Sequence, residues 1–193
     1  MEPYIEANVQ LNKQPWNRHK MSRIHLPDTI IGEETIVCSR ATIYAGTVIG
    51  SKCFIADNAS IREHVRIGDN TLIGRNVTIE NTTHIGKSVM IQTGAHITGN
   101  CIIEDNVFIG PEVCTMNDKY MGLKPTQLRG PIIRKGAVIG GNATILPEIV
   151  IGEKAVIGAG SVVTKNVPPY EIWVGNPAEQ MRDKNGYFNM GRK

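Results

Sequence analysis

One apolar side chain recurs at every sixth position from Ile31 to Ile109, and the pattern resumes in the same phase from Ile133 to Val163. The first run holds fourteen consecutive positions, thirteen of them isoleucine and one valine. A six-residue step turns about 240° around an α-helix, so these side chains cannot form one helical face. The spacing favours short β-branched strands joined by tight turns. Because each strand is too short to bury its own face, we expect stability to come from stacking one coil on the next.

The pattern divides the chain into three parts. Residues 1–28 lack the repeat and are predicted to cap the open strand edges of the first coil. Residues 29–168 carry the repeat and are predicted to form the main domain. Prolines at 168 and 169 end the pattern, so residues 169–193 are predicted to form a loop and a short helix over Ala178–Lys184.

The repeat lapses between about residues 115 and 131, although its phase is preserved across the gap. A break of this length in so regular a pattern predicts an extruded loop. Loops that interrupt a rigid scaffold often carry functional residues, so we expect the loop to belong to a site. A tolerated insertion without a role is the alternative.

The repeat resembles that of the hexapeptide-repeat acyltransferases, and the resemblance covers Ile31 to about Arg182. It implies an all-β fold, a left-handed parallel β-helix in which three hexapeptides make one triangular coil. Residues eighteen apart would then stack at a strand spacing of about 4.8 Å. The family also implies a homotrimer. The glycines that fall on one face are predicted to permit close packing of the subunits; they are Gly32, Gly50, Gly68 and Gly86.

Composition narrows the class of protein. With 193 residues, 41% of them hydrophobic and 20% charged, the chain is predicted to form one globular domain with small appendages. No apolar run reaches the roughly 18 residues that a membrane helix needs. Four scattered cysteines without metal-site spacing predict a reduced, cytoplasmic protein. The net charge of +3 is too small to indicate nucleic acid, but basic residues gather at 13–23 and 118–135, either against a phosphate-bearing ligand or on a solvated surface.

The segment from Ile157 to Pro168, with Val174–Ala178 after it, resembles the acyl-CoA end of that family. The resemblance implies acetyl-CoA or another acyl-CoA as co-substrate, held in a groove between two subunits, and no metal. Small residues let a ligand approach the backbone closely, and basic side chains neutralise its phosphates. The binding residues implied are Gly140, Gly141, Gly158, Ala159, Lys165, Pro177 and Arg182.

The segment from Val107 to Asp118 resembles the loop entry of nucleotide-sugar N-acetyltransferases, in which Gly-Pro precedes an Asn or His of the site. Gly110-Pro111 followed by Asn117 matches that spacing. In such enzymes an Asn at this place orients the substrate amine or the thioester. A free amine needs no strong base, so a site without a base is adequate for N-acylation. The resemblance implies an amino sugar carried on a nucleotide as the acceptor.

Three more residues are catalytic candidates. His96 lies eighteen residues before Cys114, so we expect it one coil below the loop entry on the same face. His84, twelve residues before His96, is expected on a different face, where it could approach His96 only across a subunit boundary. Each histidine is either a site residue or ordinary surface. Asp118 either fixes an amine or a ribose hydroxyl, or caps a turn.

Three rival functions share the expected fold. A sugar O-acetyltransferase would use an Asn-x-x-x-His or His-Asp setting, and Asn81 and His84 are one residue too close for the first. A γ-class carbonic anhydrase would need a three-histidine zinc site with a close pair that the repeats lack. A non-catalytic scaffold is the third. The sequence therefore predicts a CoA-dependent acyltransferase that acts on a sugar amine.

Overall fold

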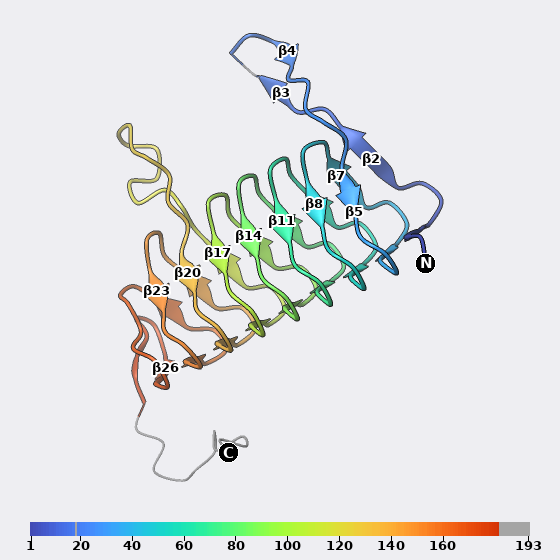
Figure 1. Ribbon diagram of the computed structural model, residues 1–193. Helices are drawn as coiled ribbons and strands as arrows, with labels where there is room; N and C mark the ends of the chain where they lie inside the picture. Colours follow the sequence, from blue (N-terminus) through green and yellow to red (C-terminus); the bar gives the residue numbers. More distant parts are fainter. Residues whose placement is uncertain (18, 182–193) are drawn as a thin grey trace.

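The computed structural model describes residues 1–17 and 19–181, which form a left-handed parallel β-helix (Figure 1). Short strands lie on three flat faces, and the chain visits the faces in a fixed order. We name each face after the strand that begins its regular coils: the β5 face, the β6 face and the β7 face. The corner between two faces takes both names. The expected all-β fold is confirmed.

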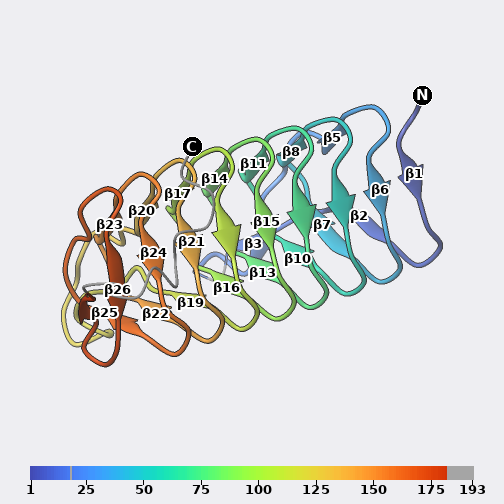
Figure 2. The ribbon, with the colours of Figure 1, turned by 90° about the horizontal axis from the view of Figure 1, so that it is seen from below.

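Each face is a ladder of strands. The β5 face holds β5 (Ile30–Ile31), β8 (Val48–Ile49), β11 (Arg66–Ile67), β14 (His84–Ile85), β17 (Ile102–Ile103), β20 (Ile132–Ile133) and β23 (Val150–Ile151). The β6 face, seen in Figure 2, holds β1 (Tyr4–Ile5), β6 (Ile36–Val37), β9 (Phe54–Ile55), β12 (Leu72–Ile73), β15 (Met90–Ile91), β18 (Phe108–Ile109), β21 (Val138–Ile139), β24 (Val156–Ile157), β26 (Ile172–Val174) and β27 (Glu179–Gln180). The β7 face holds β2 (Gln10–Lys13), β7 (Thr42–Tyr44), β10 (Ser60–Ile61), β13 (Thr78–Ile79), β16 (His96–Ile97), β19 (Cys114–Thr115), β22 (Thr144–Ile145) and β25 (Val162–Val163).

The register of the ladders follows the repeat. Ile61 pairs with Ile79 and Ile79 with Ile97, so an eighteen-residue step moves the chain one coil along the rod. All three side chains are fully buried inside the prism. A buried isoleucine contributes about 1.5–3 kcal/mol, and stacked copies of it hold together strands that have almost no length of their own.

Buried threonines form hydrogen bonds between neighbouring coils at the corners. The Thr35 hydroxyl donates to the Gly50 carbonyl at 2.7 Å, and Thr71 donates to Gly86 in the same way at 3.0 Å. No buried side-chain nitrogen or oxygen in the described part of the chain lacks a hydrogen-bond partner. We call the apolar residue at every sixth position of the repeat an anchor. The polar positions four residues after an anchor therefore belong to the core.

The stacked glycines of the β5/β6 corner are explained inside one chain. A Cβ at Gly32 would lie 2.5 Å from the Gly50 carbonyl carbon, and one at Gly68 would lie 2.7 Å from that of Gly86. Only glycine fits because successive coils touch backbone to backbone. These glycines are therefore required by contact between coils of one chain and give no support to subunit packing.

The N-terminal segment joins the rod and then leaves it. Strand β1 pairs with β6 and β2 pairs with β7, so both lie on the first strand edges. Between β2 and β5 the chain forms a projecting hairpin of β3 (Trp16–Asn17) and β4 (Ser22–Arg23) at the β7/β5 corner (Figure 1).

The expected short helix over Ala178–Lys184 is wrong for the part that the structure describes, residues 178–181. A turn at Asn176–Pro177 reverses the chain, and β27 pairs antiparallel with β26. The Met181 amide donates to the Ile172 carbonyl at 2.7 Å. An open strand edge at the end of the ladder offers more backbone hydrogen bonds than an isolated turn of helix, so the segment becomes a strand.

Candidate functional site

The loop leaves the β7/β5 corner between β19 and β20, and Asn117 holds its base. The Asn117 side-chain amide donates to the Gly99 carbonyl of the coil before it at 3.1 Å. The Asn117 carbonyl accepts the Arg129 amide at 2.9 Å, which closes the loop across its two ends. The side-chain oxygen of Asn117 keeps its acceptor capacity for another group.

Asp118 shapes the loop. One oxygen of its carboxylate accepts the Tyr120 amide at 2.9 Å and the other accepts the Gly122 amide at 2.8 Å. The geometry is that of a turn cap, one of the two roles that the sequence left open. A direct role of Asp118 toward a substrate stays a prediction.

His96 lies where the eighteen-residue step places it. It pairs in register with Cys114 on the β7 face, and its side chain is exposed. Burial raises the pKa of the Cys114 thiol, so the thiol stays protonated near neutral pH and is a poor nucleophile. His96 is thus the exposed candidate side chain on this strand pair.

His84 lies on the β5 face, where it pairs with Arg66 and Ile102. It lines a shallow hollow of about 350 Å³ together with Arg66 and Lys135. Within one subunit Asn117 and Asp118 therefore lie at the β7/β5 corner, with His96 on one adjoining face and His84 on the other.

A second hollow, of about 490 Å³, connects the loop base to the last coils. Asp118, Lys119 and Lys165 are among its lining residues. Lys119 forms an ion pair with Glu148 at 3.3 Å, which ties the loop to the next coil. The ammonium of Lys165 lies 5.2 Å from the centre of the Trp173 ring. Lys165 therefore belongs to the loop corner.

The remaining residues implied for CoA lie at the β6/β7 corner. Gly140 and Gly141 follow β21, Gly158 and Ala159 follow β24, and Pro177 follows β26. A Cβ at Gly140 would lie 2.4 Å from the Ala159 nitrogen, so neighbouring coils touch here too. The amides of Gly141 and Ala159 make no hydrogen bond to any described residue. Two free donors on adjacent coils, without side chains to cover them, fit the carbonyl groups of a pantetheine arm. Arg182 lies outside the described residues.

Within residues 1–17 and 19–181, no group of three His, Cys, Asp or Glu side chains is arranged to hold a metal ion. A search of the same residues for a helix long and apolar enough to cross a membrane finds none.

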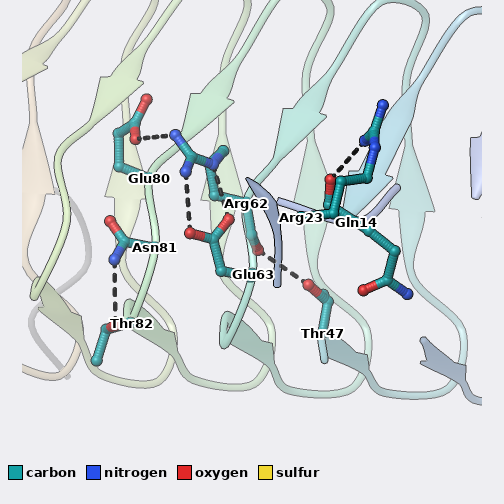
Figure 3. A network of polar contacts seen from close by, with 8 residues as sticks. All are labelled: Gln14, Arg23, Thr47, Arg62, Glu63, Glu80, Asn81 and Thr82. Carbon is teal, nitrogen blue, oxygen red and sulfur yellow. Dashed lines mark hydrogen bonds and ion pairs between the residues drawn. The ribbon is translucent and has the colours of Figure 1, made fainter. Parts of the chain in front are cut away.

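Two features escaped the reading of the sequence. The residue that precedes each anchor on the β6 face is apolar along the whole rod, and the row reads Tyr4, Ile36, Phe54, Leu72, Met90, Phe108, Val138 and Val156. We call this row the apolar ladder. The apolar ladder is visible when outward residues are compared at a period of eighteen, one coil. At a period of six the outward residues of all three faces are mixed and the row is hidden. The second feature is a polar network at the β7/β5 corner (Figure 3).

That network centres on Arg62. Its guanidinium donates twice to Glu63, at 2.8 and 2.9 Å, and once to Glu80 at 3.3 Å (Figure 3). It also lies 5.0 Å from the centre of the Tyr44 ring, with Lys13 at the same distance from that ring. Hydrogen bonding to Glu63 raises the pKa of Arg62, so the cation is fixed here. The network keeps the corner between the hairpin and the loop polar and ordered.

Comparison with known proteins places the repeat in a family. Residues 46–81, 82–114 and 130–165 match the bacterial transferase hexapeptide repeat, and residues 28–62 match a hexapeptide repeat of succinyl-transferases. This chain belongs to the bacterial transferase hexapeptide family. The family membership agrees with the resemblance seen in the repeat.

Individual relatives cover parts of the chain. A protein of Staphylococcus aureus (strain COL), named as a putative acetyltransferase, is 52% identical over 54 residues, which are 28% of this chain and 27% of that protein. The match thus spans about a quarter of the curated relative. A galactoside acetyltransferase solved with coenzyme A is 28% identical with a TM-score of 0.53, covering 66% of this chain and 68% of that one. A variant GDP-perosamine N-acetyltransferase of Caulobacter crescentus, solved with CoA and GDP-perosamine, is 23% identical with a TM-score of 0.56, covering 74% and 57%, and shares the fold.

Proposed function

We propose that this protein transfers an acetyl group from acetyl-CoA to the amino group of a nucleotide-linked amino sugar, and that it does so as a homotrimer. The observation that carries the proposal is the pairing of two sites on one rod. One is the loop corner with Asn117, beside the β7 face that carries His96, and the other is a corner of small residues with the free Gly141 and Ala159 amides. Relatives solved with CoA and with a nucleotide-linked amino sugar support the two ligands.

The residues suggest a division of roles. The free amides at the small-residue corner hold the carbonyl groups of the CoA arm, and Lys165 lies within reach of a phosphate beside the loop. Asn117 orients the acceptor amine at the loop base. The amine nitrogen bonds to the acyl carbon, the CoA thiolate leaves, and the amine gives up a proton, for which we assign the exposed His96 as acceptor.

Three-fold assembly would bring the two corners together. A cyclic trimer uses two different faces of each subunit, and the corner that these faces share points to the axis. If the β6 face of one subunit packs on the β5 face of the next, the β5/β6 corner lies at the axis. The outer edge of each interface then joins the loop corner of one subunit to the small-residue corner of its neighbour.

Exposed apolar side chains support this assembly. Phe54 and Met90 of the apolar ladder are 41% and 46% exposed in the single chain. At the loop, Met121 and Leu123 are 74% and 84% exposed. Contiguous apolar surface of this extent is typical of subunit interfaces, and an apolar loop tip suits contact with a neighbouring copy.

O-acetylation of a sugar is the second candidate, and the exposed His96 favours it. A hydroxyl acceptor needs a general base, whereas a free amine does not. Removing a true base lowers the rate about 10²- to 10⁴-fold. His96→Ala should therefore have a large effect on an O-acetyltransferase and a smaller one on an N-acetyltransferase.

A thermal-shift screen of acetyl-CoA, nucleotides and nucleotide-linked amino sugars is the first test. A ligand at a hundred times its Kd stabilises the folded state by about 2.7 kcal/mol, a clear shift. Release of free CoA with each sugar then measures transfer. Asn117→Ala and His96→Ala should each lower kcat/KM, while Glu2→Ala, an exposed residue before β1 and away from the site, should not. Near-wild-type activity in both variants would remove the site assignment, and failure of every acyl-CoA to bind would favour a non-catalytic scaffold.

A further inference from the structure

The hairpin carries an exposed indole in a fixed position. Trp16 is 56% exposed although it lies in a strand. Its cross-strand partner Arg23 covers one side of it, with the guanidinium 4.9 Å from the ring centre. Arg23 in turn donates to the Gln14 carbonyl at 2.8 Å. The cation is therefore held against the indole, and the ring keeps exposed surface for a further contact.

The base of the hairpin is rigid as well. The Gln14 side chain donates to the Leu26 carbonyl at 3.2 Å and accepts the Leu26 amide at 2.8 Å. The Ile24 amide donates to the Pro15 carbonyl at 2.8 Å. Because these bonds join both arms of the hairpin, its orientation is set before any ligand arrives, which lowers the entropy lost on binding.

The hairpin leans over the corner that leads to the loop. It leaves the rod at the β7/β5 corner after β2, and the loop leaves the same corner after β19. The points at which the hairpin and the loop leave the rod, after β2 and after β19, are five strand steps apart along the β7 face, about 24 Å at 4.8 Å per step. Figures 1 and 2 both place the hairpin above the intervening coils, toward the loop. An extended ligand lying along this corner would meet Trp16 at one end and Asn117 at the other.

The charge of the hairpin is uncompensated. From Lys13 to Arg23 the sequence holds no acidic residue. Lys13, Lys20 and Arg23 form no ion pair with a carboxylate of the described chain. Arg62, by contrast, is neutralised by Glu63 and Glu80. The spare positive charge thus lies on the hairpin and at its base, with Arg23 against the exposed indole.

We propose that Trp16 and Arg23 form a platform for the nucleoside diphosphate of the acceptor, with the base stacked on the indole and the phosphates near Lys13 and Lys20. An indole with unpaired cations suits a ligand that combines a flat ring with negative charge, and a neutral glycan would leave the cations unused. The platform rests on the proposed function, since it names where the nucleotide of that substrate binds. Its distance from Asn117 separates recognition of the nucleotide from the chemistry.

Calorimetry with UDP, dTDP, GDP and acetyl-CoA tests the platform on the full chain. Trp16→Ala should raise the Kd of the preferred nucleotide about tenfold and leave that of acetyl-CoA unchanged, because stacking on an aromatic ring carries much of the affinity for a base. Trp16→Phe keeps a ring and should bind nearly as wild type. Met21→Asn is the matched control, since Met21 is exposed on the same hairpin at a φ of 47°, which asparagine adopts readily.

The other outcomes overturn the platform, and they differ from failure of the enzyme. Nucleotide affinity unchanged in Trp16→Ala would place the nucleotide elsewhere. Weaker acetyl-CoA binding with unchanged nucleotide binding would assign the platform to the nucleotide of CoA. Acetyl transfer to a free sugar with no nucleotide binding in wild type would overturn the platform and leave acetyl transfer in place. Unchanged secondary structure by circular dichroism in every variant would exclude misfolding.

Discussion

The β6 and β7 faces share one construction and differ in what they present outward. Both pair strands in register every eighteen residues outside the loop, and each buries its own column of mostly isoleucine side chains. Outside, the β6 face carries the apolar ladder. The β7 face carries a row of mostly polar side chains, which reads Gln10, Thr42, Ser60, Thr78, His96, Cys114, Thr144 and Val162.

This difference shows that the inward and outward positions of the hexapeptide are under different constraints. The inward position of each hexapeptide must fill a prism of constant width, so it tolerates little beyond isoleucine and valine. The outward position faces no such limit within a single chain. Its identity is free to serve contacts beyond the chain, and the contrast between the faces therefore concerns assembly and ligands more than folding.

Replacing an inward side chain should have the largest effect. Ile97→Ala removes a fully buried side chain from the middle of the rod and should lower the free energy of unfolding by about 2–5 kcal/mol. Thr78→Ala, one coil earlier and outward, should change it by less than about 0.5 kcal/mol. Urea denaturation of both variants measures the difference. Equal losses would mean that inward and outward positions do not divide as described.

Charging the apolar ladder should break assembly. Phe54→Asp with Met90→Asp places two carboxylates on the β6 face, on the strands either side of β12, and should convert the expected trimer to monomers, because an interface does not bury unpaired charge. Ser60→Asp with Thr78→Asp on the β7 face is the matched control and should stay trimeric. Size-exclusion chromatography with light scattering reports the mass. A wild-type monomer, or a trimer that survives the first double variant, would contradict the assembly.

The sequence predicted the inward half of this comparison and missed the outward half. The six-residue period specified the buried isoleucines, the phase across the loop, and the placement of His96 beside Cys114. It could not specify the hairpin at Trp16, because that segment has no period and is held by the individual bonds of Gln14. The helix expected at Ala178 failed because an open strand edge nearby outweighs weak local helix propensity.

The candidate site was predictable in part. The loop base at Asn117 follows from the interruption of the repeat, but the hydrogen bond from Asn117 to Gly99 depends on stacking that only three dimensions show. The residues implied for CoA looked like one set in the sequence. They divide between two corners, since Lys165 lies one strand beyond Gly158 and Ala159 along the coil.

Where neighbouring coils touch at a corner, substitutions should destabilise the fold more than substitutions at outward positions of either face. Gly140→Ala would place a methyl group 2.4 Å from the Ala159 nitrogen, so the two coils must separate, and we expect a loss of about 1–3 kcal/mol in the free energy of unfolding. Gly160→Asn is the control, because its Cβ would meet nothing within 4 Å and its φ of 69° suits asparagine. Thermal unfolding compares them. A Gly140→Ala variant as stable as Gly160→Asn would show that the corner can relax.

Acid should weaken the corners before it affects the apolar ladder. At the β5/β6 corner, Arg134 donates to Glu104 at 2.6 Å, and this hydrogen bond is the main reason that the pKa of Glu104 lies below its usual value. A carboxyl whose folded pKa is lowered adds stability above its unfolded pKa, and the stability is lost as pH falls through the folded pKa. The pair is partly exposed, so its contribution should stay below about 1 kcal/mol.

Glu104→Gln should flatten the pH dependence of the unfolding free energy in that acid range by this amount, and leave the value near neutral pH only slightly lower. The apolar ladder contains no carboxylate and no histidine. Protonation of its side chains should therefore not change the mass of the assembly between pH 6 and 4. Urea denaturation at fixed protein concentration across the range, with Glu104→Gln beside wild type, isolates the ion pair. An identical slope in both proteins would assign the acid sensitivity to other carboxylates, of which Asp69, with a pKa lowered chiefly by the Ser51 amide, is the next to replace.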